Sequence, residues 1–524
     1  MLLSQDRAPF AAALAPWRTS ARQRLLARVR AIDAVLGPRA LDGLLANLDV
    51  ELGVAAAPAL LDAFRRDPDR RWFTRHTSDD YRAFAARLVD GRLDELLAGA
   101  PVLADLLELV AADWGARTVA LTERLRSDRA ALRERFGFRL PVARACPVVS
   151  TAIGLRDGDG QAVIYKARSL TMDAAFAALL RWLNTRAPAP ALHVVEIVER
   201  PGYGWMTLVP HGSIPGGTGR AAYLVRSGML LCLVHLLGGG DLHAANIRCA
   251  NEHPVIVDAE VLLRPRRAGD DERGGFGPSV ASTGWLPVPG DLDRCGLAAE
   301  HYRGRALPWL EIGTDGVRPR PQAHTRGRVR PRLVEAWARE APDIVAHLCA
   351  GFSAGYALVR RHGLPLELFV GAAPRILLRT SRLYGDAIER SLAPACLTSV
   401  AARNRAFDWV DREIPPSLRR HPEVAARVAE AERASMRRLE MPRFVTPATA
   451  RTLCCGDQVL GTPFDESPLE RASRFLAAMS PAAEATQRKA IAGAVYAAAS
   501  GSFDAVGVRF ELVTSEEQRA WSMA

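Results

Sequence analysis

The stretch 238-GGGDLHAANIRCANEHPVIVDAE-260 decides how the rest of the chain is interpreted. Three polar residues, Asp241, His243 and Asn246, stand on a short turn that begins with glycines. The apolar run PVIV that comes after them is short and rich in Val and Ile, so it predicts a buried strand, and that strand delivers Asp258. A strand that ends in Asp, beside a loop that ends in Asn, brings two oxygen ligands together.

This arrangement of residues is suited to phosphoryl transfer. Hard oxygen ligands such as Asn246 and Asp258 suit Mg²⁺, which usually stays partly hydrated and is shared with substrate phosphates. Asp241 can then act on a hydroxyl, as the catalytic-loop Asp does in kinases. The alternative is a surface turn with an ordinary Asx motif. For any one of these residues the surface turn is the more common case, but for the four together the site is favoured.

Lysine is rare in this chain, which makes one lysine informative. Of 69 basic residues only Lys166 and Lys489 are Lys, and the formal net charge is +11. A compact ammonium aimed at phosphate is one of the few tasks for which Arg does not replace Lys. Lys166 ends the strand-like run QAVIYK after a Gly-Asp-Gly turn. We therefore interpret it as a phosphate-binding residue rather than a leftover surface lysine.

Length and composition set the broad class. A chain of 524 residues has room for two or three domains with ample core. It contains 49% hydrophobic residues, but no uninterrupted apolar run of about twenty, so we expect no transmembrane segment. The N-terminus does not resemble a secretory signal. Eight scattered cysteines show neither zinc spacing nor a disulfide framework, which predicts a reduced, cytoplasmic enzyme.

The periodicity of apolar residues divides the chain into four regions. Residues 1–135 read as helical, and residues 136–215 as a small β-rich lobe with one helix, MDAAFAALLRWLN. Residues 216–400 hold a long apolar helix followed by the loop that carries Asp241, His243 and Asn246, called here the central loop. Residues 401–524 read as helical. The strand-like runs are PVVSTAIGL, QAVIYKARSL, LHVVEIVERP, YGWMTLVP and, further on, PRILLRTSRLY (374–384). The absence of G-x-G-x-x-G from the small lobe argues against a standard protein kinase.

A basic run lies in the long Gly-, Pro- and Arg-rich segment at about 264–332, which we expect to be irregular. It could hold an acidic peptide or a phosphate, or it could be a solvated face, and the sequence leaves both open. No aromatic residues alternate with these arginines, and no nucleic-acid-binding fold is evident, so no nucleic-acid partner is expected. The arginines of this run are Arg318, Arg320, Arg326, Arg328, Arg330 and Arg332.

Several motifs, taken together and in order, resemble a known family. They are APVLADLLELVAADW, YKARSL, RPGYGWMTLV, GGGDLHAANI, HPVIVDAEVLL, PRILLRTSRLY, MPRF and SPAAEATQRKAIAGAV. The chain resembles, over nearly its whole length, the N-terminal dehydratase half of class II lanthipeptide synthetases (the LanM type). YKxRSL and YGW alone are weak signals, but with DLHxxN and its spaced Asp they are specific.

The resemblance implies an α+β fold, with a lipid-kinase-like bilobal core and extensive helical additions. It implies a cytoplasmic enzyme that uses ATP and Mg²⁺ to phosphorylate Ser and Thr of a precursor peptide, and that then eliminates the phosphate. By motif, Lys166 and Arg168 would contact ATP, and Asp241 and His243 would be catalytic. Asn246 and Asp258 would bind Mg²⁺, in agreement with the interpretation from the residues alone.

Two departures from the family pattern concern the steps after phosphorylation. The sequence has no Cys…Cys-His zinc constellation of a cyclase domain, so we expect a separate cyclase or elimination partner. Arg144 and Cys146 stand where the family has the Asp and His that serve elimination. Arg375 matches another elimination residue, and Ser381 replaces a Thr. A missing general base slows proton removal by about 10²–10⁴-fold, which places elimination in doubt.

The sequence therefore predicts a lanthipeptide-dehydratase-like kinase that acts on a peptide with a leader and a Ser/Thr-rich core. One alternative is a small-molecule phosphotransferase with the same core, because fold does not fix substrate. Another is a degenerate module that binds a leader peptide without ATP. The sequence does not show which residue pairs with Lys166, since the next helix lacks the Glu of protein kinases.

Overall fold

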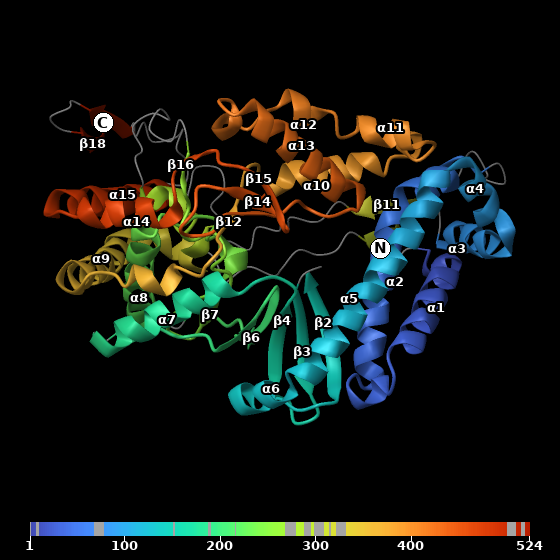
Figure 1. The fold of residues 1–524 in the computed structure, drawn as a ribbon, viewed down its shortest axis with the longest axis horizontal. Coiled ribbons are helices and arrows are strands. Elements are labelled where there is room, and N and C mark those ends of the chain that lie inside the picture. Colours follow the sequence, from blue (N-terminus) through green and yellow to red (C-terminus); the bar gives the residue numbers. More distant parts are fainter. Residues whose placement is uncertain are drawn as a thin grey trace.

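The computed structural model shows a protein of mixed helix and sheet (Figure 1). The residues that it describes are 2–6, 10–67, 78–149, 152–186, 190–214, 216–267, 279–287, 295–297, 309–313, 316–320, 332–499, 510–514 and 519–523.

Helices make up most of the first part of the chain, as the spacing of its apolar residues predicts. They are α1 (Ala11–Arg28), α2 (Pro38–Arg65), α3 (Ser78–Arg87), α4 (Leu93–Gly99), α5 (Pro101–Ser127) and α6 (Arg129–Phe136). Their apolar sides share one core, in which Leu48 and Leu107 are fully buried. Pro101 stands at the start of α5, where its missing N–H costs no helical hydrogen bond.

A five-stranded antiparallel sheet comes next, in the order β2-β3-β4-β6-β5. Its strands are β2 (Val142–Val149), β3 (Ala152–Asp157), β4 (Ala162–Lys166), β5 (Ile197–Arg200) and β6 (Tyr203–Thr207). The predicted helix of this region is α7 (Thr171–Arg186). The run PVVSTAIGL, predicted as one strand, is instead the end of β2 and the start of β3, because the chain reverses between them.

The N-terminal helices pack directly on this sheet. A Cβ atom at Gly43 of α2 would stand 2.3 Å from the carbonyl oxygen of Ala145 on β2, so only glycine allows this approach. The aromatic residues Tyr165 and Trp205 of the sheet belong to the same core as the helices. The sheet and the N-terminal helices therefore form one packed unit.

Asp128, between α5 and α6, ties the YGW motif to these helices. Its buried carboxylate accepts hydrogen bonds from the Tyr203 hydroxyl at 2.9 Å and the Trp205 indole at 2.8 Å. Arg200 Nε donates to the other carboxylate oxygen at 2.7 Å. The motif that marked the family resemblance thus has a structural task, which is to fix the β5–β6 hairpin.

The central loop is carried by a second core on the other side of the sheet (Figure 1). This core contains α7, α8 (Gly217–Leu236), α9 (Arg332–His362), α14 (Pro468–Ala477) and α15 (Pro481–Ala499). Helices α8 and α9 touch through two glycines. A Cβ atom at Gly228 would stand 2.1 Å from the Leu348 oxygen, and one at Gly351 would stand 1.9 Å from the Val225 oxygen.

Short strands bring distant segments towards the central loop. The hairpin β7 (Ile247–Ala250) and β8 (His253–Ile256) confirms the strand predicted before Asp258. A small sheet joins β12 (Arg375–Ile376), β13 (Phe444–Val445), β14 (Leu453–Cys455) and β15 (Gln458–Gly461). The region 401–524 is therefore not only helical, since it also contains β16 (Phe464–Glu466), β17 (Phe510–Thr514) and β18 (Arg519–Met523).

The helices beside this small sheet are α10 (Ser381–Ser391), α11 (Val400–Arg405), α12 (Trp409–Arg412) and α13 (Pro422–Arg437). Helix α13 packs on the sheet, and α10 and α12 pack on α13. The prediction of a strand over 374–384 is wrong after Ile376, because α10 begins at Ser381. The spacing of Tyr384, Ala387 and Ser391, which are the buried residues of α10, is helical.

The segment predicted as irregular contains several regular elements. They are β9 (Arg266–Arg267), the 3₁₀ turn η4 (Val280–Thr283), β10 (Trp309–Gly313) and β11 (Gly316–Arg320). Strand β10 also pairs with β1 (Leu2–Asp6). Of the predicted basic run, Arg318 and Arg320 lie on β11 and Arg332 begins α9, whereas the other three arginines lie outside the described residues.

Among the described residues, two helical segments are long and apolar enough to cross a membrane, namely α2 and Glu340–His362 of α9. Half of the most apolar window of α2 is buried inside the fold, as is 44% of that of α9. Core helices pass the same test of length and composition, so these segments are weak evidence for a membrane location. The expectation of a protein without transmembrane segments stays a prediction.

Candidate functional site

The Asp241 turn is built by tight packing behind it. Asp241 has φ 59°, a left-handed conformation that is uncommon outside glycine but tolerated best by Asp and Asn. Just before it, a Cβ atom at Gly239 would stand 2.6 Å from Leu262. Arg264 donates to the carbonyl oxygens of Gly238 at 2.7 Å and Gly239 at 3.1 Å. The glycines and Arg264 therefore fix the path of the chain into Asp241.

His243 and Asn246 both contact Asp241. The Nε2 atom of His243 lies 3.6 Å from Asp241 Oδ1, and Asn246 Nδ2 donates to the Asp241 carbonyl oxygen at 2.7 Å. His243 Nδ1 accepts from the Ala245 amide at 3.2 Å, so Nε2 carries the proton in the neutral ring and faces Asp241. The turn thus presents a carboxylate with a hydrogen-bond donor beside it.

The predicted oxygen ligands lie next to each other. The Val257 amide donates to the Asn246 carbonyl oxygen at 2.9 Å, which brings Asp258 beside the turn. The Asp258 side chain is 28% exposed. Its Oδ1 atom pairs with both Lys166 and Arg168, which leaves Oδ2 for another ligand. In the described part of the chain, the Asn246 Oδ1 atom has no hydrogen-bond partner. Both residues therefore keep an oxygen atom that a cation could use.

Lys166 reaches this pair from β4, across the boundary between the sheet and the second core. Its ammonium donates to the Val257 carbonyl oxygen at 2.7 Å and lies 3.6 Å from Asp258 Oδ1 and 3.7 Å from Asp173 Oδ1. The side chain is 9% exposed. The partner of Lys166 that the sequence left open is therefore Asp173 of α7, together with Asp258.

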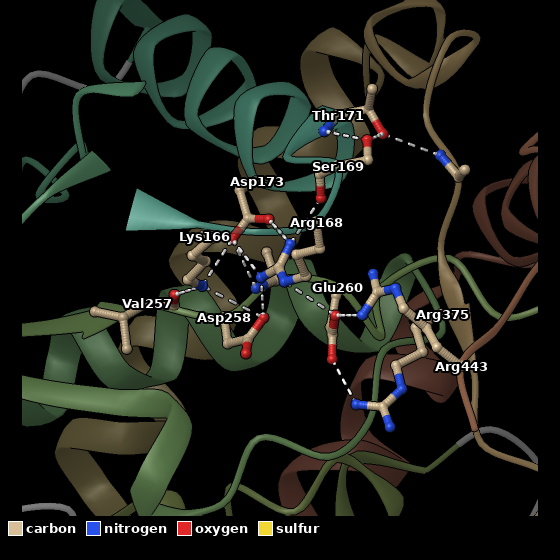
Figure 2. A network of polar contacts seen from close by, with 12 residues as sticks. Lys166, Arg168, Ser169, Thr171, Asp173, Val257, Asp258, Glu260, Arg375 and Arg443 are labelled. Atoms are coloured by element: carbon tan, nitrogen blue, oxygen red, sulfur yellow. Dashed lines mark hydrogen bonds and ion pairs between the residues drawn. The ribbon is translucent and has the colours of Figure 1, made fainter. Parts of the chain in front are cut away.

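Arg168 lies at the centre of a cluster of charged side chains that includes Lys166 and Asp258, as Figure 2 shows. Its guanidinium contacts Asp173 at 2.7 Å and Glu260 at 3.2 Å, and it also pairs with Asp258. The side chain is 6% exposed, and Nη1 donates to the Ser169 carbonyl oxygen as well. All three guanidinium nitrogens are thus engaged with protein oxygens, so Arg168 orients the carboxylates around it.

Glu260 links this cluster to two arginines from distant segments (Figure 2). Its Oε1 accepts from Arg375 at 2.7 Å, and its Oε2 accepts from Arg443. The Arg375 amide also donates to the Glu260 carbonyl oxygen at 2.6 Å. Arg375 comes from β12, and Arg443 directly precedes β13. The pairing of these two strands therefore sets the two arginines side by side on one carboxylate.

The charges divide the carboxylates into two kinds. Burial alone would raise the pKa values of Asp173 and Glu260. The positive charges of Arg168 and Lys166 instead lower the pKa of Asp173 below its ordinary value. Those of Arg168, Arg443 and Arg375 do the same for Glu260. Burial raises the pKa of Asp258, and Lys166 and Arg168 offset this only in part. Asp173 and Glu260 are thus held as anions, whereas ionised Asp258 is stabilised less.

Asp241 is like Asp258, because its pKa is also raised above the ordinary value. Burial raises its pKa, His243 and Arg375 act against the rise, and the negative charges of Asp258 and Glu260 add to it. A carboxylate with a raised pKa is a stronger base than an exposed one. Such shifts are common at catalytic positions, although structural ion-pair networks also produce them.

The predicted site residues mostly come together. The cluster contains Lys166, Arg168, Asp241, His243, Asn246, Asp258 and Arg375. Ser381 does not join it: this residue is exposed at the start of α10, and within the described residues no hydrogen bond links it to the cluster. Arg144 and Cys146 are exposed on β2.

Three residues of the cluster were missed by the sequence-based interpretation. Asp173 lies in the helix where a protein kinase would place a Glu, and Glu260 closes the stretch 238–260. Arg443 belongs to the MPRF motif, to which the sequence assigned no role. The motifs themselves were the available signal, because all three residues lie within or beside them.

The residues fit a divalent cation that is shared with a phosphate. Among the described residues, no group of three or more His, Cys, Asp or Glu side chains could hold a metal ion. Asn246 and Asp258 offer two oxygens, and Mg²⁺ typically takes one or two carboxylates and completes its shell with water and phosphate oxygens. Lys166 fits the phosphate itself. Its two carboxylate neighbours lie beyond hydrogen-bond distance, so two of its three N–H bonds remain for a ligand.

Comparison with known proteins gives a family and no close relative. No curated protein matches the chain. A family model described as a domain of unknown function, DUF4135, matches residues 101–447, which is about two thirds of the chain and includes every member of the cluster. The chain therefore belongs to the DUF4135 family, which is associated with lanthipeptide synthetase-like proteins.

Proposed function

We propose that this protein is a lanthipeptide-dehydratase-like kinase, with a lipid-kinase-like core of the LanM type. It transfers phosphate from ATP to Ser and Thr side chains of a ribosomally made precursor peptide. One observation carries the proposal: Lys166 meets Asp258 beside the turn that holds Asp241 and Asn246. These residues come from separate segments, and their types match the parts that phosphoryl transfer requires.

Each residue has a task in this proposal. Asp241 accepts the proton of the attacking hydroxyl, and His243 holds the Asp241 carboxylate in place. Asn246 and Asp258 hold Mg²⁺, and Lys166 binds a phosphate of ATP. When bound, Mg²⁺ neutralises the charge of the phosphates that ATP brings.

Arg168 takes a different task from the one expected. Its nitrogens are taken by Asp173, Asp258, Glu260 and a carbonyl oxygen, so in this proposal it holds Asp258 rather than ATP. Arg375 is better placed for a phosphate, since it lies at the edge of the cluster and its side chain is 21% exposed.

In this proposal the reaction stops at the phosphorylated peptide, without elimination of the phosphate. Elimination needs a base for the α-proton, and the positions where the family carries Asp and His hold Arg144 and Cys146 here. Ser381, the counterpart of a further elimination residue, is exposed and apart from the cluster. Elimination would then depend on replacement residues or on a partner protein. We place the reaction in the cytoplasm, where ATP is available and where the eight cysteines, none of which forms a disulfide in the structure, stay reduced.

Intact mass spectrometry tests the proposal. The precursor peptide encoded nearest this gene is incubated with the protein, ATP and Mg²⁺. A gain of about 80 Da per site is the expected result and identifies a kinase. A loss of about 18 Da would show full dehydration and overturn the limit placed on elimination. An unchanged peptide, while the protein still binds ATP, would contradict a peptide substrate.

A further inference from the structure

A groove of about 690 Å³ opens beside the segment that joins β12 to α10. One wall consists of residues 378–380 with Leu383 of α10, and the other of residues 412–416 with Arg419. Leu383 is 38% exposed and Ile414 is 39% exposed, so both offer aliphatic surface to the groove. A volume of this size lies in the range of ligand-binding pockets, roughly 300–1,000 Å³.

The two walls are tied together by Arg379, which donates a hydrogen bond to the carbonyl oxygen of Glu413 and is held by a buried ion pair. Arg379, from the first wall, contacts Glu432 at 2.8 Å, and Glu432 is fully buried. The same guanidinium donates to the carbonyl oxygens of Val410, at 3.1 Å, and of Glu413, and it lies over the Trp409 ring. The groove is therefore formed in advance, and a ligand would lose little free energy in ordering it.

The rim of the groove carries positive charge. Arg412 and Arg419 are exposed and, within the described residues, form no ion pair. Glu413 supplies the one carboxylate among the lining residues. An occupant with carboxylates on its flanks and an aliphatic side chain between them would complement both the charged rim and the aliphatic surface of Leu383 and Ile414.

The groove lies close to the candidate site along the chain. Leu378, in its wall, is three residues from Arg375, which contacts Glu260 in the cluster. Three residues of extended chain span about 11 Å at most, because each contributes roughly 3.3–3.6 Å. A peptide in the groove is thus near enough for a neighbouring part of it to reach the site.

We propose that this groove binds an acidic, aliphatic segment of the peptide substrate and so presents the chain to the catalytic turn. The inference rests on the proposed function, since it supplies that reaction with a docking surface. The aliphatic side chain packs against Leu383 and Ile414, and the flanking carboxylates pair with Arg412 and Arg419.

Fluorescence anisotropy without ATP tests the groove by itself. The probe is a short fluorescein-labelled peptide that alternates leucine with glutamate around one serine, and the matched probe has glutamine in place of glutamate. The full-length R412E/R419E protein should bind the acidic peptide at least about tenfold more weakly than wild type, because like charges then face each other. The full-length L383S/I414S protein should also bind it more weakly, through loss of the aliphatic surface.

The matched control is R22E/R28E, which reverses two exposed arginines on α1 and changes the net charge equally. It should bind as wild type does. The proposal would be overturned if wild type bound both peptides equally or bound neither. It would also be overturned if R22E/R28E and R412E/R419E lost the same amount of peptide binding. A change in oligomeric state by light scattering for the groove variants alone would assign the groove to a second copy of the chain and would also overturn it.

The two proposals fail in different ways. If the anisotropy pattern holds but the mass of the precursor peptide never changes, the groove stands and the kinase proposal fails. If the peptide is phosphorylated and R412E/R419E leaves KM unaltered, the kinase stands and the groove proposal fails.

Discussion

The ammonium of Lys166 donates to the carbonyl oxygen of Val257 at 2.7 Å, and Val257 directly precedes the proposed metal ligand Asp258. A residue at the end of β4 is thereby fastened to the residue that directly follows β8, 91 residues later in the chain. This contact holds the ammonium in place while leaving N–H bonds for a phosphate. The position of Lys166 is thus fixed before any nucleotide arrives.

We expect K166R to lose activity nearly as severely as K166M. A planar guanidinium cannot reproduce a compact ammonium that points at once to a carbonyl and to a phosphate. Removing one preorganised donor costs about 10²–10³-fold in kcat. The kcat for ATP-dependent peptide phosphorylation measures this, with K489R, on α15, as the matched control. Retention of wild-type kcat by K166R would contradict a specific role for the ammonium.

Replacing Asp241 with Asn should stop phosphate transfer while the protein stays folded. The amide keeps the shape of the side chain but cannot accept the hydroxyl proton, and loss of a general base costs about 10²–10⁴-fold. Because the pKa of Asp241 is raised, the folded state binds its proton more readily than the unfolded state. Asp241 therefore lowers stability as pH rises above 3.8, and D241N should remove that decline. Urea unfolding across pH and the transfer rate check both statements, and an active D241N protein would refute the role.

The pH profile should respond to Arg375. This guanidinium lowers the pKa of Asp241, against the rise that burial causes. Because R375Q removes that charge, the pKa of Asp241 should rise further, and the acidic limb of kcat/KM should move to higher pH. R443Q is the matched control, because Arg443 also pairs with Glu260 but is not among the charges that shift Asp241. Equal displacement of the limb in both variants would show that the whole cluster, and not Arg375, sets this pKa.

Glu260 should contribute strongly to stability. E260Q leaves Arg168, Arg375 and Arg443 without their shared anion, and breaking a buried ion pair of this kind costs about 3–5 kcal/mol. The pKa of Glu260 is held below its ordinary value of 4.5, so its contribution is complete above that pH and is lost as pH falls below it. The gap between wild type and E260Q in urea unfolding should therefore narrow in acid. The exposed Glu95, paired with Arg92, is the control, and E95Q should change stability by at most about 1 kcal/mol.

Local sequence patterns predicted the elements that carry the site. The helices α7 and α8 and the strand before Asp258 follow from the spacing of their apolar residues, which depends only on near neighbours. The types of Lys166 and Asp258 indicated a role for each residue, but not their contact with each other. These features could be predicted from the sequence because each depends on residues that are close together along the chain.

The parts that were missed depend on contacts between distant segments. Glu260 meets Arg443 across 183 residues, and no local pattern specifies that pairing. The role proposed for Arg168 differs from the expected one for the same reason, since its enclosure by three carboxylates arises only when α7 and the central loop meet. The strand predicted over 374–384 failed for a different reason: PRILLRTSRLY is rich in strand-forming residues, but the packing of α10 on its neighbours decides the structure after Ile376.

The close packing of α8 on α9 gives a prediction that is independent of chemistry. In G228A the new Cβ atom would stand 2.1 Å from the Leu348 oxygen, a backbone atom that cannot turn away. Overpacking of this kind costs about 1–3 kcal/mol, and because α8 leads directly into the Asp241 turn, kcat should fall as well. Gly115 of α5 is the matched control, since a Cβ atom there meets nothing within 4 Å. G115A should raise stability by about 0.5–1 kcal/mol, because alanine favours a helix over glycine. Thermal unfolding should thus move in opposite directions for the two variants, and a G228A protein as stable as wild type would contradict the packing of α8 on α9.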